Sequence, residues 1–138
     1  MEANLSDIVP LVERRRFPRL KCASPIQYRD VFKPHELFFG CLSRDLSAGG
    51  LRMTASKILP SDARLVVLLS LPDSLRQIRS ITRVTWQRHL PRGTAYDYGL
   101  QFIEITAEDQ EAISDFVERG VVVNSTQSST PNPREMAV

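Results

Sequence analysis

The residues with the strongest chemical character form a cluster of arginines near the N-terminus. The stretch Glu13–Arg19 contains four arginines in seven positions, and only Arg15 has a second arginine, Arg19, four residues later. A guanidinium is always charged, and its rigid fork of N–H donors fits phosphate oxygens and the N7 and O6 acceptors of guanine. The cluster therefore indicates an acidic or nucleotide-like partner. Taken alone, it is equally typical of a solvated basic arm.

A second polar motif, D-x-S-x-x-G, lies about 25 residues further along the chain. Asp45 and Ser47 have side chains that can hydrogen-bond to their own backbone, while Gly49 and Gly50 can adopt a positive φ or allow a ligand to approach closely. Aspartate, serine and glycine are also the usual residues of a tight turn between two strands. Alone, this motif predicts a hairpin turn.

Four aromatic residues in the second half of the chain are candidates for stacking on nucleic-acid bases. They are Trp86, Tyr96, Tyr98 and Phe102. Because they alternate in phase with Val84 and Leu100, we expect them on the buried face of their strands. A role in the core is therefore the favoured interpretation. Phe17, within the arginine cluster, is the exception.

The chain lacks the sequence patterns of metal sites and of common enzyme classes. His35 and His89 have no H-x-x-H or H-E-x-x-H spacing, and no nucleophile elbow, P-loop or dinucleotide fingerprint is present. Cys22 and Cys41 form no C-x-x-C pair, so we expect two reduced cysteines in the core. The sequence predicts neither an enzyme nor a metal or cofactor site.

Length and composition predict one soluble globular domain. The chain has 138 residues, 25% of them charged and 42% hydrophobic, with a formal net charge of +2. This charge is too small for the whole surface to be a nucleic-acid interface. No apolar stretch is long enough to span a membrane, and the first residues are acidic where a signal peptide is basic. We therefore expect a cytoplasmic protein.

The middle of the chain has the alternation and turn spacing of an all-β barrel or sandwich. Most of the candidate strands alternate apolar and polar residues, whereas the run Val66–Leu69 is apolar throughout and is expected to be buried on both faces. The six predicted strands are Ile26–Val31, Leu37–Leu46, Leu51–Ala55, Arg64–Leu71, Arg76–Gln87 and a last strand from Tyr96 to Phe102.

One helix is predicted after the strands. Thr106 is a suitable N-cap, Ile113 and Val117 follow at helical spacing, and Gly120 is a suitable end. The domain is expected to span residues 13–120 and to include the basic arm and the closing helix. Residues 1–12 are predicted to be a mobile lead and residues 121–138, rich in serine, threonine and asparagine, a disordered tail.

Together the two polar motifs are far more specific than either alone. The combination of R-x-x-x-R on an extended arm with D-x-S-x-x-G at the end of a strand resembles the PilZ domain family over about Glu13 to Arg119. The resemblance extends to the Trp86-bearing strand, the Tyr98–Phe102 strand and the closing helix. It implies a six-stranded antiparallel β-barrel with one C-terminal α-helix, and binding of the bacterial second messenger cyclic di-GMP.

The family's ligand-binding positions are intact in this sequence. The resemblance implies that Arg15 and Arg19 grip guanine edges and phosphates, and that the turn with Asp45, Ser47 and Gly50 encloses a second guanine, with the Gly49 backbone beside it. Arg14, directly before R-x-x-x-R, resembles members that bind an intercalated pair of ligand molecules. Arg16 is expected to face water.

The resulting prediction is a receptor or adaptor whose flexible arm becomes ordered when the ligand neutralises it, and which signals through an unidentified effector protein. Two alternatives remain open. A small basic barrel that binds single-stranded nucleic acid would lose affinity steeply with salt and would show little preference for guanine dinucleotides. A PilZ-like domain that only binds proteins would use the arginines as a docking patch.

Overall fold

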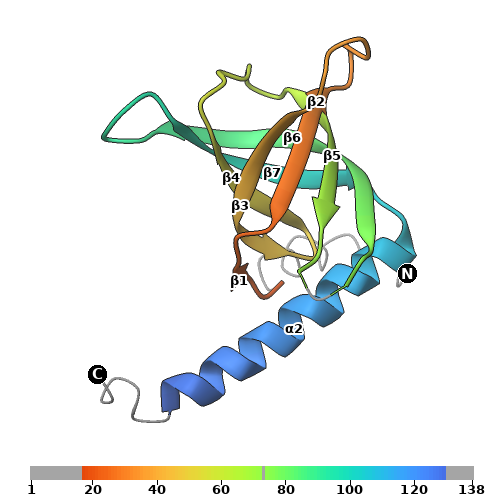
Figure 1. The fold of residues 1–138 in the computed structure, drawn as a ribbon, viewed down its shortest axis with the longest axis vertical. Helices are drawn as coiled ribbons and strands as arrows, with labels where there is room; N and C mark the ends of the chain where they lie inside the picture. The colour runs from red at the N-terminus through yellow and green to blue at the C-terminus, as the bar shows by residue number, and fades with distance from the viewer. Residues whose placement is uncertain (1–16, 73, 130–138) are drawn as a thin grey trace, which may run out of the picture.

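The computed structural model describes residues 17–72 and 74–129, with side chains as far as Gly120. Six strands form a closed antiparallel barrel in the order β3-β2-β5-β6-β7-β4, and pairing of β4 with β3 completes the ring. A two-residue strand, β1 (Leu20–Lys21), pairs with the last residues of β3, and the helix α2 (Ala107–Ser129) crosses one end of the barrel (Figure 1). The barrel strands are β2 (Pro25–Asp30), β3 (Phe39–Ser47), β4 (Gly50–Ala55), β5 (Arg64–Ser70), β6 (Gln77–His89) and β7 (Tyr96–Glu104).

Alternation of apolar side chains produces the core. Ile26 and Tyr28 of β2 are buried, as are Ile78 of β6 and Tyr98 of β7. In β5 the burial is continuous over Leu65–Val67 and includes Leu69, whereas Leu68 is only partly buried, so the predicted burial on both faces holds for most of the apolar run. The six predicted strands are all present, and their bounds differ from the prediction by a few residues at the ends. Strand β1 was not predicted because two residues carry no periodic pattern.

Trp86 does not lie in the core, contrary to the prediction from the sequence. Val84 pairs with Leu100 and Trp86 with Gly99, so two steps along β6 match one step along β7. The extra residue, Thr85, is a β-bulge that shifts the following side chains to the other face. Trp86 is consequently 44% exposed. The predicted core positions of Tyr98 and Phe102 are confirmed, because both side chains are buried.

The helix α2 begins as predicted and ends later than predicted. The Asp109 amide donates to Thr106 Oγ1 at 3.1 Å, which caps the first turn, and Ile113 and Val117 are buried against the barrel. Gly120 does not stop the helix, since α2 continues to Ser129. A Cβ at Gly120 would lie 2.4 Å from Leu20 Cδ2, so the glycine admits the Leu20 side chain. The helix therefore includes residues 121–129 of the segment expected to be a disordered tail, while residues 130–138 lie outside the described part.

The described residues contain neither a reactive cysteine nor a cluster of metal ligands. Cys22 and Cys41 are free thiols that pack at the edge of the core, and burial raises the pKa of Cys41 to about 11, which keeps its thiol protonated and unreactive. Within residues 17–72 and 74–129 no group of three potential metal ligands occurs. The one helix of that part is not apolar enough to cross a bilayer.

Candidate nucleotide-binding site

The turn between β3 and β4 is held by its own serine. The Gly49 amide donates to Ser47 Oγ at 3.2 Å, and Ser47 Oγ donates to the Gly50 carbonyl at 3.3 Å. Ser47 is buried, so its hydroxyl is committed to the backbone of the turn. The side chain of Gln110 in α2 also donates to the Ala48 carbonyl at 2.9 Å. The D-x-S-x-x-G turn is thus fixed from inside and by the helix.

Both glycines of the turn are needed for close approach and not for an unusual φ. Neither is among the described residues with positive φ. A Cβ at Gly50 would lie 2.0 Å from the Leu100 carbonyl oxygen, which belongs to the neighbouring strand. A Cβ at Gly49 would lie 2.9 Å from the ring of Phe17. The turn therefore packs directly against β7 and against the start of the described arm.

The arm and the turn meet in an ion pair. Arg19 Nη1 lies 3.0 Å from Asp45 Oδ1, so one residue of each polar motif contacts the other. Strand β1 explains the geometry, because it pairs Lys21 with Asp45 and brings the arm alongside β3. Arg14, Arg15 and Arg16 lie outside the described residues. Their predicted roles therefore stay predictions.

A second arginine, Arg52, completes the charged group and was missed in the sequence. Its Nε lies 3.1 Å from Asp45 Oδ2, and its Nη1 lies 3.3 Å from Asp97 Oδ2. Asp45 therefore has one oxygen on Arg19 and the other on Arg52. The available signal was weak: Arg52 is the charged residue between Leu51 and Met53, which the alternation places on the outer face of β4.

Asp97 is a carboxylate that the fold has buried and surrounded with donors. Thr54 Oγ1 donates to Asp97 Oδ1 at 2.7 Å, and Arg88 Nη2 lies 3.0 Å from Asp97 Oδ2. Burial by itself raises the pKa of Asp97, but the hydrogen bonds from Thr54 and Arg88 and the charges of Arg52 and Arg88 outweigh it and lower the pKa. Asp97 is therefore ionised at neutral pH.

These elements surround a hollow of about 280 Å³ on the barrel wall. Arg19 and Arg52 supply charge, Ser47 and the two glycines form the turn side, and Trp86 forms an aromatic wall over Gly99. Asp45 does not line the hollow but touches both arginines that do. The complete lining is Arg19, Ser47, Gly49, Gly50, Leu51, Arg52, Thr85, Trp86, Gly99, Leu100 and Gln101.

The chemistry of this hollow suits a planar, anionic ligand. Two guanidinium groups offer donors for phosphate or for guanine acceptors, and the indole of Trp86 offers a face for stacking. Gln101 adds an amide that already accepts from Arg83 Nη2 at 3.3 Å. The lining contains no cysteine, histidine or carboxylate, so within the described residues it lacks a nucleophile–base pair.

A family model described as PilZ domain matches residues 13–119. The chain belongs to the PilZ domain family. The match and the closed barrel confirm the predicted fold, a six-stranded antiparallel PilZ-type β-barrel with one C-terminal helix. A comparison with curated protein sequences finds no match.

Solved structures of several other proteins resemble this one. The Bacillus subtilis inhibitor of motility MotI/DgrA has a TM-score of 0.69 and 24% identity over 77% of this chain and 50% of that one. The Escherichia coli YcgR PilZ domain with c-di-GMP has a TM-score of 0.63 and 13% identity, over 85% of this chain and 98% of that one. The K. pneumonia MrkH–c-di-GMP complex has a TM-score of 0.59 and 20% identity, over 83% of this chain and 55% of that one. This PilZ chain spans about half the length of MotI/DgrA and of MrkH.

Proposed function

We propose that this PilZ domain is a receptor for cyclic di-GMP and not an enzyme. The observation that carries the proposal is the contact between Arg19 and Asp45, because it joins the R-x-x-x-R arm to the D-x-S-x-x-G turn at the edge of one hollow. Structures of YcgR and MrkH with c-di-GMP support the choice of ligand. The cytoplasmic location predicted from the sequence is part of the proposal.

The contacts follow from the chemistry of a guanine dinucleotide. Arg15 and Arg19 grip guanine edges and phosphates, and Asp45 accepts from a guanine N–H on lone pairs that its arginine partners leave free. Ser47 and the backbone around Gly49 and Gly50 border the second guanine. Contacts worth about 1–3 kcal/mol each suffice for micromolar affinity, even after the cost of ordering the arm.

Trp86 adds a contact that the motifs do not include. Its indole lies over Gly99, with 44% of the residue exposed beside the hollow. Stacking of a base on an aromatic side chain is worth about 1–3 kcal/mol. We therefore include Trp86 among the ligand-binding residues, together with Arg52.

Signalling follows from ordering of the arm. Arg14, Arg15, Arg16 and Arg19 repel one another, and the ligand phosphates remove that repulsion, so the arm folds onto the barrel when ligand binds. Leu20, directly after Arg19, already packs on Gly120 of α2. The ordered arm then creates or hides a surface that an effector protein recognises.

Isothermal titration calorimetry with cyclic di-GMP tests the receptor. Arg15→Ala and Arg19→Ala each lower the affinity by about tenfold or more, because each removes a charged contact. Arg79→Ala is the matched control, since Arg79 is an exposed arginine of β6 that does not line the hollow. Equal affinity in all three variants would contradict the site. Absence of binding to the unmodified chain would instead favour a PilZ-like module that binds only proteins.

Stoichiometry and salt dependence separate the remaining possibilities. With Arg14 stacked on an intercalated ligand pair, the unmodified chain binds two molecules per protomer and Arg14→Ala binds one. A single ligand on the unmodified chain would refute the intercalated pair. Single-stranded nucleic acid that binds with a steep salt dependence, and that cyclic di-GMP does not displace, would favour the nucleic-acid alternative.

A further inference from the structure

A chain of alternating charges runs behind the hollow, and Arg52 is at its centre. Arg52 Nε lies 3.1 Å from Asp45, and Arg52 Nη1 lies 3.3 Å from Asp97. The Arg52 side chain is 25% exposed, whereas that of Asp97 is 3% exposed. Arg52 lines the hollow and Asp97 does not. The buried carboxylate therefore lies on the protein side of an arginine that faces the ligand site.

Two carboxylates fix the plane of the Arg52 guanidinium. A guanidinium is planar and carries five N–H donors in a rigid fork, so anchoring Nε and Nη1 leaves only one orientation for the rest. The donors that are not engaged by Asp45 and Asp97 remain for an acceptor in the hollow. A single anchor at Asp45 would leave the end of the side chain free to rotate, because arginine has high rotamer entropy.

Asp97 is itself held from two other strands. Thr54 of β4 donates to Asp97 Oδ1 at 2.7 Å, and Arg88 of β6 lies 3.0 Å from Oδ2. The carboxylate therefore cannot follow Arg52 if that side chain moves. Arg88 is well exposed, with 64% of its side chain accessible, so it neutralises Asp97 from the outer side.

We propose that Asp97 is a positioning residue for nucleotide binding, which holds the Arg52 guanidinium so that its free donors meet an acceptor oxygen or nitrogen of the ligand. The inference rests on the proposed function for the identity of the ligand. It adds a residue that lies outside both polar motifs and outside the hollow. Asp97 acts only through Arg52, so its contribution to affinity disappears when Arg52 is absent.

Calorimetry on a double-mutant cycle tests this coupling. Asp97→Asn keeps the side-chain size and removes the charge, and lowers the affinity for cyclic di-GMP by about fivefold to tenfold, as does Arg52→Gln. In the Arg52→Gln background, Asp97→Asn changes the affinity by less than about twofold. Arg79→Gln is the control: Arg79 is an exposed arginine of the same strand, β6, that does not line the hollow, and its loss leaves the affinity within about twofold. Independent, multiplicative losses for Asp97→Asn and Arg52→Gln would overturn the proposal.

A measurement without ligand separates this proposal from the receptor function. In the NMR spectrum of arginine side chains, the Arg52 Nε–H is held by Asp45 and the Arg52 Nη1 protons are held by Asp97, so both are protected from solvent exchange. The Nη1 protons lose this protection in Asp97→Asn but not in Arg79→Gln. If the unmodified chain binds no cyclic di-GMP, the receptor function fails and this spectrum still decides whether Asp97 holds Arg52. Unchanged protection in Asp97→Asn would overturn the positioning role. Thr54→Val, which removes one donor from Asp97, serves if Asp97→Asn does not fold, and shows a smaller change in the same direction.

Discussion

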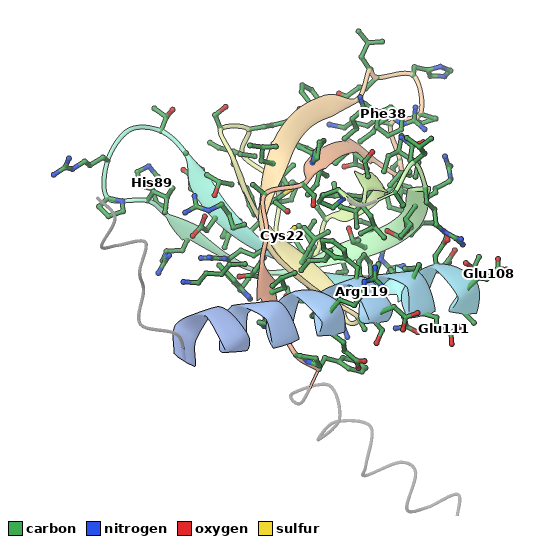
Figure 2. The ribbon with its side chains drawn as sticks, turned by 60° about the horizontal axis from the view of Figure 1, so that its bottom comes forward. Cys22, Phe38, His89, Glu108, Glu111 and Arg119 are labelled. Atoms are coloured by element: carbon green, nitrogen blue, oxygen red, sulfur yellow. The ribbon has the colours of Figure 1, made fainter. Side chains whose placement is uncertain are left out.

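Cationic side chains have different partners at the two ends of the barrel. At the end crossed by α2, Arg19 and Arg52 are each paired with Asp45, and the turn beside them is bonded to the helix. At the opposite end, Arg29 lies 4.4 Å from the centre of the Phe38 ring. Figure 2 shows Phe38 at the end of the barrel away from α2. One end fixes its cations with carboxylates, and the other places them on aromatic faces.

The opposite end exposes several large apolar side chains. Phe32, Leu37 and Ile58 are 78%, 86% and 67% exposed. Lys57 Nζ lies 4.2 Å from the centre of the Phe39 ring, and it forms no ion pair with another described residue. A cation over an exposed ring keeps its freedom to move, whereas a guanidinium between two carboxylates does not. Charged side chains are therefore held by carboxylates at the end where the ligand is proposed to bind.

The largest effect is expected from filling the space at a glycine. Gly50→Ala lowers the free energy of unfolding by about 2–3 kcal/mol or more, because the new Cβ would lie 2.0 Å from the Leu100 carbonyl oxygen. Gly40→Ala, near the opposite end, meets nothing within 4 Å and leaves stability within about 0.5 kcal/mol. Urea unfolding of both variants measures the contrast. Similar losses in the two would show that the turn is no more tightly packed than the far end.

The next effect is on ligand affinity. Arg19→Ala lowers the affinity for cyclic di-GMP by about tenfold or more, because it removes a cation from the hollow. Lys57→Ala removes an equal charge from the opposite end and changes the affinity by less than about twofold. Calorimetry at physiological salt compares them. A loss of affinity in Lys57→Ala as large as in Arg19→Ala would mean that net charge, and not position, drives binding.

The charge chain also predicts a dependence of stability on pH. The folded-state pKa of Asp97 is lowered, so its contribution to stability is complete above the pKa of the unfolded chain, about 3.9, and is lost as the pH falls through the lower folded value. Asp97→Asn lacks this contribution at every pH. The difference in unfolding free energy between the two proteins therefore shrinks between about pH 5 and pH 2. A constant difference across this range in urea titrations would contradict the assigned ion pairs.

The smallest effect belongs to the apolar end. Lys57→Ala lowers the free energy of unfolding by about 0.5–1 kcal/mol, the usual value of an exposed cation–π contact. Lys33→Ala, in the neighbouring β2–β3 loop, has no such contact among the described residues and serves as the control. Thermal unfolding measures both. A larger loss in Lys57→Ala than in Asp97→Asn would reverse the comparison between the two ends.

The sequence predicted the barrel well because most strands alternate. The period of two placed Tyr98 and Phe102 correctly in the core. A local motif correctly identified Thr106 as the N-cap, which accepts from the Asp109 amide. Trp86 was misplaced because one extra residue in β6 reverses the phase, and a bulge leaves no mark in a single sequence. Gly120 was misread as a helix end, since the side chain that it admits, Leu20, is a hundred residues away in the sequence.

The sequence predicted only the residues of the candidate site that belong to a motif. Asp45, Ser47 and Gly50 stand out by their spacing and are close together in the fold. Arg52 and Asp97 carry no motif, because their role depends on the pairing of β4 with β7, which brings them together from distant positions. Long-range pairing of this kind is set by tertiary structure and not by local pattern.

The contact between Leu20 and Gly120 joins the arm directly to α2. Leu20 follows directly on Arg19, and a Cβ at Gly120 would overlap its side chain, so β1 rests on the backbone of the helix without an intervening side chain. Beyond this point α2 runs on to Ser129, past the edge of the barrel (Figure 1). A change in the position of β1 at this contact would therefore reach the helix backbone directly, at the point where α2 leaves the barrel.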